Sequence, residues 1–180
     1  YLPKLASGEY LGAYSLSEAS SGTDAAAMVA KASDDGDYFT LNGEKMWVTN
    51  GTTADIFVLF AKVTDHPDYG KKRHGGVTCF IVEKGFDGFK IGKKEDKLGI
   101  RSSDTCTLIL DNCKVPKENV LGEVGNGFGI AMNALDNSRI GIAAQALGIA
   151  QGAYESALKY SKERETFGKP IAQHQSISNY

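Results

Sequence analysis

Residues 14–24 read YSLSEASSGTD, and the interpretation of the whole chain depends on them. Aromatic and apolar residues at 10–14 favour an extended, buried backbone just before the hydroxyl residues begin. Around Gly22 the chain carries a cluster of hydroxyl side chains: Ser17, Ser20, Ser21 and Thr23. These features predict a strand that ends in a loop able to approach a ligand closely. A turn that caps a short helical segment at 25–27 explains the same residues, so the stretch alone leaves both interpretations open.

A second patch, KMWVTNG, follows at 45–51. It contains the only tryptophan of the chain, Trp47, and a further hydroxyl, Thr49, at the end of a predicted strand. An aromatic plane beside converging hydroxyl groups suits a flat heteroaromatic ring with a polar edge. We therefore expect the two patches to form one binding site for such a ring.

The composition excludes several classes of protein. The chain has 180 residues, a net charge of −2 and a pI of about 5.9, whereas a nucleic-acid-binding protein usually has a basic face. Its cysteines, Cys79, Cys106 and Cys113, lack the spacing of zinc ligands, so we expect reduced structural thiols and no metal site. No apolar run reaches the ~20 residues that span a bilayer. The chain lacks an initiating Met and stops inside a predicted helix, so we expect it to be part of a longer protein.

The first two thirds of the chain predict β structure. The sequences DDGD at 34–37 and NG at 42–43 are hairpin signals on either side of a short strand at 38–41, with its partner strand at 45–49. An apolar run at 55–63 indicates a strand buried on both faces. About seven short strands with turns every 8–12 residues are typical of a sandwich or barrel.

The pattern changes at residue 121, where a glycine-rich linker begins. Apolar residues at spacings of three, four or seven then predict one long helix over 127–165, roughly 55–60 Å at 1.5 Å per residue. Three glycines weaken this helix, and close packing against further helices would compensate: Gly141, Gly148 and Gly152.

The predicted fold class is therefore α+β. An antiparallel β-barrel or sandwich domain over 1–120 is followed, over 121–180, by the first helices of a four-helix-bundle domain. Phe167 and Gly168 end the long helix, and Pro170 begins another helical segment.

The polar sequence DNSR at 136–139 interrupts the apolar stripe of the long helix. An exposed pair between Asp136 and Arg139 is one explanation. Arg139 however lies on the stripe itself, four residues after Leu135 and three before Ile142, where a charge needs a partner or a ligand. We favour a functional role.

Together these segments resemble the FAD-dependent acyl-CoA dehydrogenase family. There a Tyr-x-x-Thr-Glu-x-x-x-Gly-Ser-Asp stretch lines the flavin and a Trp-Ile-Thr stretch stacks on it. In this chain Ser17 replaces the Thr and Thr23 the Ser, so both hydroxyls are kept. Ala19 and Ser20 stand where that family usually has Pro and Gly.

The sequence RETFGKP at 164–170, followed by His174 and Gln175, resembles the Arg-x-x-Phe-Gly signature with a downstream Gln of the same family. The resemblance implies that Arg164 and Gln175 bind the FAD of a neighbouring subunit, the Arg at its pyrophosphate. A guanidinium suits paired phosphate oxygens, and Phe167 offers a stacking face. An Arg that complements the helix dipole is the plainer alternative. The sequence KLGIRSS at 97–103 also resembles a family turn, which we interpret as structural.

The resemblance implies these site residues. FAD would be bound by Tyr14, Leu16, Ser17, Trp47, Val48, Thr49, Arg164, Thr166, Phe167 and Gln175, and the acyl-CoA substrate by Thr23, Asp136, Asn137, Ser138 and Arg139. It also implies a catalytic Glu beyond Tyr180. A minority of the family places this base just before the Arg of the long helix, where this chain has Ser138.

The function so implied is α,β-dehydrogenation of a fatty acyl-CoA by a homotetramer, a dimer of dimers. An electron-transfer flavoprotein would take the electrons, in the bacterial cytoplasm or the mitochondrial matrix. Two alternatives stay open: an acyl-CoA oxidase or flavin monooxygenase on the same scaffold, and a non-catalytic binding module.

Overall fold

The computed structural model describes residues 1–179, which fall into one compact unit over Tyr1–Met132 and a second that begins at Asn133. In chain order the elements are α1 (Leu2–Ser7), β1 (Gly12–Ser15), η1 (Ala25–Ala27), β2 (Lys31–Asp34), β3 (Tyr38–Thr49), β4 (Ile56–Val63), β5 (Val77–Glu83), β6 (Phe89–Lys94), β7 (Thr105–Pro116), η2 (Lys117–Asn119), α2 (Gly127–Glu163), β8 (Glu165–Thr166), β9 (Lys169–Pro170), η3 (Ile171–Gln173) and α3 (Gln175–Ser178). The predicted α+β class is confirmed. The sequence did not predict α1.

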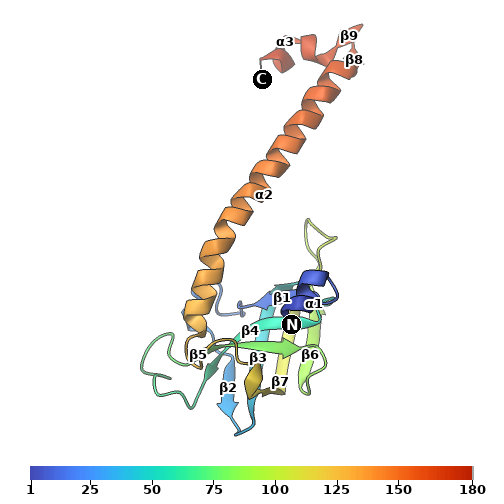
Figure 1. Cartoon of the computed structure of the whole chain (residues 1–180). Helices are drawn as coiled ribbons and strands as arrows, with labels where there is room; N and C mark the ends of the chain where they lie inside the picture. Colours follow the sequence, from blue (N-terminus) through green and yellow to red (C-terminus); the bar gives the residue numbers. More distant parts are fainter. Residues whose placement is uncertain (180) are drawn as a thin grey trace. The chain divides into compact units, whose positions relative to one another are not determined.

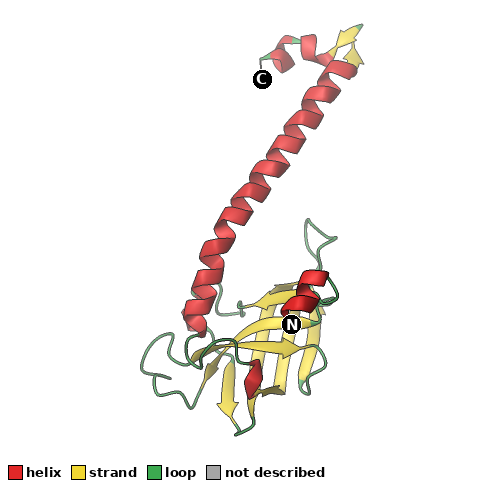
Figure 2. Cartoon of the chain, in the orientation of Figure 1, coloured by secondary structure: helices red, strands yellow, loops and turns green. Residues whose placement is uncertain are grey.

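The first unit is built on a curled seven-stranded sheet, yellow in Figure 2. The pairs β2–β3, β3–β7, β4–β5 and β6–β7 are antiparallel, as expected. Strands β1 and β2 instead run parallel to β4, so the sheet is mixed and not wholly antiparallel.

The parallel strands explain how the sheet presents residues 16–30. Strand β5 pairs with β4 along 56–62 and so occupies one edge of it. Strand β1 pairs with β4 at 56–59 and β2 at 62–63, so both lie on the opposite edge and run in the same direction. Residues 16–30 are therefore an excursion from one edge of β4, which leaves the sheet after β1 and returns as β2.

The second predicted hairpin is wrong, because β3 continues through residues 42–43. It pairs with the long strand β7 on both sides of this point, and a register shift between Leu41 and Gly43 marks a bulge. Gly43 has φ 143°, and a Cβ there would lie 2.8 Å from the Cβ of Ala30. Gly43 therefore allows β3 to pack closely against the main chain at Ala30. The hairpin at 34–37 is confirmed, with Gly36 at φ 86°.

The main hydrophobic core of the first unit contains side chains from all seven strands of the sheet, among them Ala13, Ala32, Leu41, Phe57, Phe80, Phe89 and Leu108. The three cysteines are free and buried, as predicted. Burial raises the pKa of both Cys79 and Cys113 to about 12.

The predicted long helix is confirmed as α2, which ends two residues earlier than expected. In the second unit its apolar side chains are exposed on more than one side, including Ile140, Ile142, Leu147, Ile149 and Tyr154. A helix that is apolar over much of its circumference is typical of a bundle interior. The following hairpin and short helices are drawn at the red end of the chain in Figure 1. Among residues 1–179, no helix has the length and apolar character of a bilayer-spanning segment.

Candidate functional site

A bulge in β3 directs Trp47 out of the sheet. The register with β7 shifts between Lys45 and Val48, so two residues of β3, Met46 and Trp47, lie opposite one residue of β7. Trp47 has φ 56°, a rare conformation for a bulky residue, and 59% of it is exposed. Val48 returns to the core, so only its main chain can face a ligand. A strained backbone that displays a large aromatic ring indicates a binding role.

The hydroxyl-rich loop is attached to this bulge. The main-chain N–H of Met46 donates to the carbonyl oxygen of Ser17 at 2.8 Å. Ser17 is half-buried, and Thr49, two residues beyond Trp47, is exposed. The structure therefore brings the two sequence patches together. Their role toward a flavin stays a prediction.

A buried ion pair beneath these residues was missed in the sequence. The Lys45 ammonium lies 2.6 Å from the Glu18 carboxylate, and burial lowers the pKa of this lysine while Glu18 opposes the shift. The available signal was the alternation along β3, which places Lys45 on the buried side together with Leu41.

Tyr14 and Leu16 lie on either side of the end of β1. The Tyr14 ring packs edge-on against Phe60 with centroids 5.3 Å apart, and partial burial raises its pKa to about 12. Leu16 is buried, and its carbonyl oxygen accepts a hydrogen bond from the Lys45 ammonium at 3.1 Å. Leu16 thus contributes chiefly through its main chain and the shape of the loop.

Thr23 is exposed at the tip of the loop. The next residue, Asp24, forms an ion pair with Arg73 from the loop between β4 and β5. The Ser21 hydroxyl donates to the Asp24 carbonyl at 3.0 Å and tightens the turn. Thr23 is therefore presented on an ordered loop, next to a cationic side chain.

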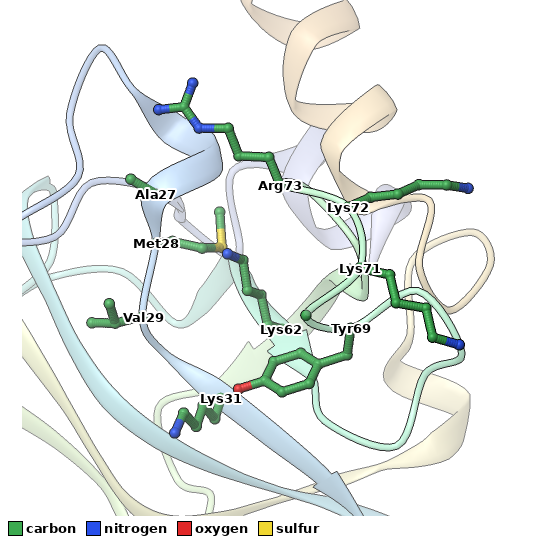
Figure 3. Close-up of a pocket in the computed structure, with 10 residues that line it drawn as sticks. Ala27, Met28, Val29, Lys31, Lys62, Tyr69, Lys71, Lys72 and Arg73 are labelled. Carbon is green, nitrogen blue, oxygen red and sulfur yellow. The ribbon is translucent and has the colours of Figure 1, made fainter.

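A basic pocket of about 480 Å³ opens beside this loop (Figure 3). Its cationic lining residues are Lys31, Lys62, Lys71, Lys72 and Arg73. Lys62 stands near the middle, where its ammonium donates to the Ala26 carbonyl at 2.9 Å, and the ring of Tyr69 lies beside it. Within residues 1–179, carboxylates pair with Arg73 and Lys72 but with none of the other three cationic residues of the pocket, so the pocket keeps an excess of positive charge in an acidic chain.

In the second unit, the β8–β9 hairpin carries two of the residues predicted to bind FAD, Thr166 and Phe167, and the other two, Arg164 and Gln175, lie on either side of it in the sequence. Phe167 lies at its tip with φ 53° and is 97% exposed, and Thr166 contacts His174 through a 3.2 Å hydrogen bond. Arg164 is exposed where α2 ends, and within residues 1–179 it forms no ion pair. Gln175 is exposed at the start of α3. His174 serves to anchor the hairpin.

The polar quartet of α2, residues 136–139, is exposed to solvent in its own unit. Arg139 and Asp136 form a loose pair at 3.7 Å, and both side chains are largely exposed. The Asn137 amide donates to the Asn133 carbonyl at 2.8 Å, and the Ser138 hydroxyl to the Leu135 carbonyl at 2.8 Å. The pair is weak in water, so the Arg139 guanidinium is free to bind a ligand.

These residues fit a flavin dinucleotide. The first unit offers an exposed indole flanked by hydroxyl-bearing residues, which suits an isoalloxazine ring and its polar edge. The second offers an exposed phenyl ring near a guanidinium, which suits an adenine nucleotide and its phosphates.

Comparison with known proteins identifies close relatives. Residues 13–113 match the acyl-CoA dehydrogenase middle domain, and residues 125–180 match the acyl-CoA dehydrogenase C-terminal domain. The chain is 52% identical over 180 residues to a short-chain-specific acyl-CoA dehydrogenase of Megasphaera elsdenii, an alignment that covers 99% of this chain and 45% of that protein.

Solved structures agree. A chain in a structure of the electron transferring flavoprotein of Acidaminococcus fermentans is similar with a TM-score of 0.92 and 50% identity, covering 99% of this chain and 46% of that one. An acyl-CoA dehydrogenase of Bacillus anthracis complexed with FAD gives a TM-score of 0.89 and 40% identity, covering 98% of this chain and 29% of that one. The chain spans less than half the length of these relatives.

Proposed function

The chain belongs to the acyl-CoA dehydrogenase family, and from this premise we propose that it acts in an FAD-dependent dehydrogenation of a short-chain acyl-CoA thioester. The observation that carries the proposal is the bulge that displays Trp47 beside the Ser17 loop. The short-chain preference rests on the relative from Megasphaera elsdenii, which is described as short-chain specific.

The cofactor would be held by both units. Trp47 would pack on the flavin ring, with Tyr14 nearby, while Ser17 and Thr49 would hydrogen-bond its edge. Arg164 would bind the pyrophosphate of an FAD held by a neighbouring subunit. Thr166 and Phe167 of the β8–β9 hairpin and Gln175 of α3 would bind the same cofactor. When bound, FAD supplies the acceptor for the two electrons that leave the Cα–Cβ bond.

The substrate would be bound by Thr23 and by the α2 quartet at 136–139. Thr23 donates a hydroxyl from an ordered loop, and Arg139 provides a cation without a strong internal partner. The basic pocket beside Thr23 adds a favourable field for the phosphates of coenzyme A. Ser138 has no carboxylate to offer, so the proton would be taken by a Glu outside residues 1–180.

The assembly and the electron acceptor are part of the same proposal. The apolar circumference of α2 would be covered by further helices of a bundle in a homotetramer. An electron-transfer flavoprotein would reoxidise the cofactor, in line with the similar chain from Acidaminococcus fermentans. The compartment would be the bacterial cytoplasm or the mitochondrial matrix.

The test is product formation by the purified full-length protein. Butyryl-CoA with an artificial electron acceptor should yield an acyl-CoA lighter by two hydrogens, as measured by mass spectrometry. The butyryl thioester of pantetheine, which lacks the nucleotide phosphates, should react with a higher KM because it cannot use the basic pocket. Absence of the enoyl product from every straight-chain acyl-CoA tested would refute the proposal.

A further inference from the structure

The buried pair of Lys45 and Glu18 connects three segments of the first unit. The Lys45 side chain is 0% exposed and the Glu18 side chain 2% exposed. Nζ of Lys45 lies 2.6 Å from Oε1 of Glu18. The ammonium also donates to the Leu16 carbonyl at 3.1 Å. The Glu18 carboxylate accepts two main-chain N–H groups, from Val29 at 2.6 Å and from Ala30 at 3.2 Å. One ion pair thus joins β3 to both ends of the hydroxyl-rich loop.

The pair is adjacent to the residues expected to touch the flavin. Lys45 is the last regular residue of β3 before the bulge that displays Trp47. Glu18 directly follows Ser17, whose carbonyl accepts the Met46 N–H at 2.8 Å. Any shift of the pair would therefore change the distance between the ring-stacking residue and the hydroxyl loop.

A contribution to the stability of the folded protein does not explain why this position holds an ion pair. Two buried charges lose their hydration, and an apolar pair of similar volume is often at least as stable. The neighbouring buried positions of β3 are apolar, as at Leu41 and Val48, so the strand tolerates such side chains. The distinctive property of the ion pair is its geometry, because the ammonium and the carboxylate each hold main-chain groups at fixed places.

We propose that Lys45 and Glu18 are positioning residues for FAD, a proposal that rests on the function proposed above. Through the Leu16 carbonyl and the Val29 and Ala30 N–H groups, they hold the loop at the separation from Trp47 that the flavin ring requires. Neither side chain touches the ring, since both are buried beneath the loop.

The test measures both the stability of the full-length protein and the environment of its bound flavin in a set of variants. Lys45→Met leaves a buried carboxylate without its cation, whereas the double variant Glu18→Gln/Lys45→Met removes both charges and leaves a side-chain oxygen for the Val29 and Ala30 N–H groups. The matched control is Leu110→Ala, a core truncation in β7. The measurements are the unfolding midpoint, the Kd for FAD of the apoprotein, and the visible circular dichroism of bound flavin.

The double variant should unfold closer to wild type than Lys45→Met does. It should nevertheless bind FAD about tenfold more weakly, equivalent to the loss of one ordinary hydrogen bond, and show an altered flavin dichroism. Leu110→Ala should unfold earlier with Kd and dichroism unchanged. If the double variant does not fold, Glu18→Gln is measured in its place. It keeps an acceptor oxygen but leaves the buried Lys45 ammonium without its counter-charge, so the pair is still disturbed.

Two results would overturn the inference. A folded double variant, or folded Glu18→Gln in its place, with the wild-type Kd and dichroism would show that the pair is structural only. A wild-type apoprotein that binds no FAD would overturn the proposed function and the positioning role together, so the two failures are distinguishable.

Discussion

The main-chain N–H of Met46 donates to the Ser17 carbonyl oxygen at 2.8 Å, which makes two segments far apart in the sequence neighbours. An N–H that is not used in the β3–β7 ladder holds the hydroxyl-rich loop, because the bulge turns this residue away from the ladder. The same bulge sends the next side chain, Trp47, outward. A single irregularity in one strand therefore both holds the loop and presents the ring.

Trp47 fluorescence should report directly on the cofactor. When apo full-length protein is reconstituted with FAD, emission should be strongly quenched, because indole and flavin would lie in contact. The quenched component should be missing in Trp47→Phe, which isolates this residue from tryptophans elsewhere in the protein. Equal quenching in both proteins would place Trp47 away from the flavin.

Arg164→Ala should weaken FAD binding by about 10- to 150-fold, the range of one charge-assisted hydrogen bond. Arg164→Lys should restore only part of the affinity, because an ammonium cannot bind two phosphate oxygens in parallel. Lys159→Ala, on the same helix and loosely paired with Glu163, is the matched control and should bind FAD normally. The affinities are measured by equilibrium titration with FAD. If Arg164→Ala binds FAD as tightly as the wild type, Arg164 is not part of the FAD site.

The sequence predicted the hydroxyl loop and the tryptophan as neighbours, because strand ends and turn residues are local signals. It failed at Gly43, where a bulge and a hairpin have the same local signature and only pairing with β7 decides. It also missed the parallel strands β1 and β2, since strand direction depends on non-local partners. The Lys45 pair escaped notice because its partner is distant in sequence.

Gly43→Ala should destabilise the first unit by about 2 kcal/mol or more, because it combines an unfavourable φ with contact against Ala30. Gly85→Ala is the control, since a Cβ there has no heavy atom within 4 Å and its φ is unrestricted. Urea unfolding of the two variants gives the comparison. Equal midpoints would mean that the close approach to Ala30 is absent in solution.

Alkaline pH should unfold the protein through its buried thiols. The folded state keeps the Cys79 proton up to a pKa of about 12, while the unfolded thiol loses it near 9, so the unfolded state binds fewer protons in between. Stability should then fall as pH rises from about 9 to 12, by up to about 1.4 kcal/mol per pH unit for each such thiol. Cys79→Ala should show a shallower slope in unfolding measured across this range, and an identical slope would contradict the assignment.

The most direct test of the account is anaerobic titration of the FAD-loaded full-length protein with butyryl-CoA, followed by visible absorption. The account predicts rapid loss of the oxidised flavin band, with faster bleaching by butyryl-CoA than by a long-chain acyl-CoA. A flavin band that stays unchanged with short-, medium- and long-chain acyl-CoA alike would contradict it.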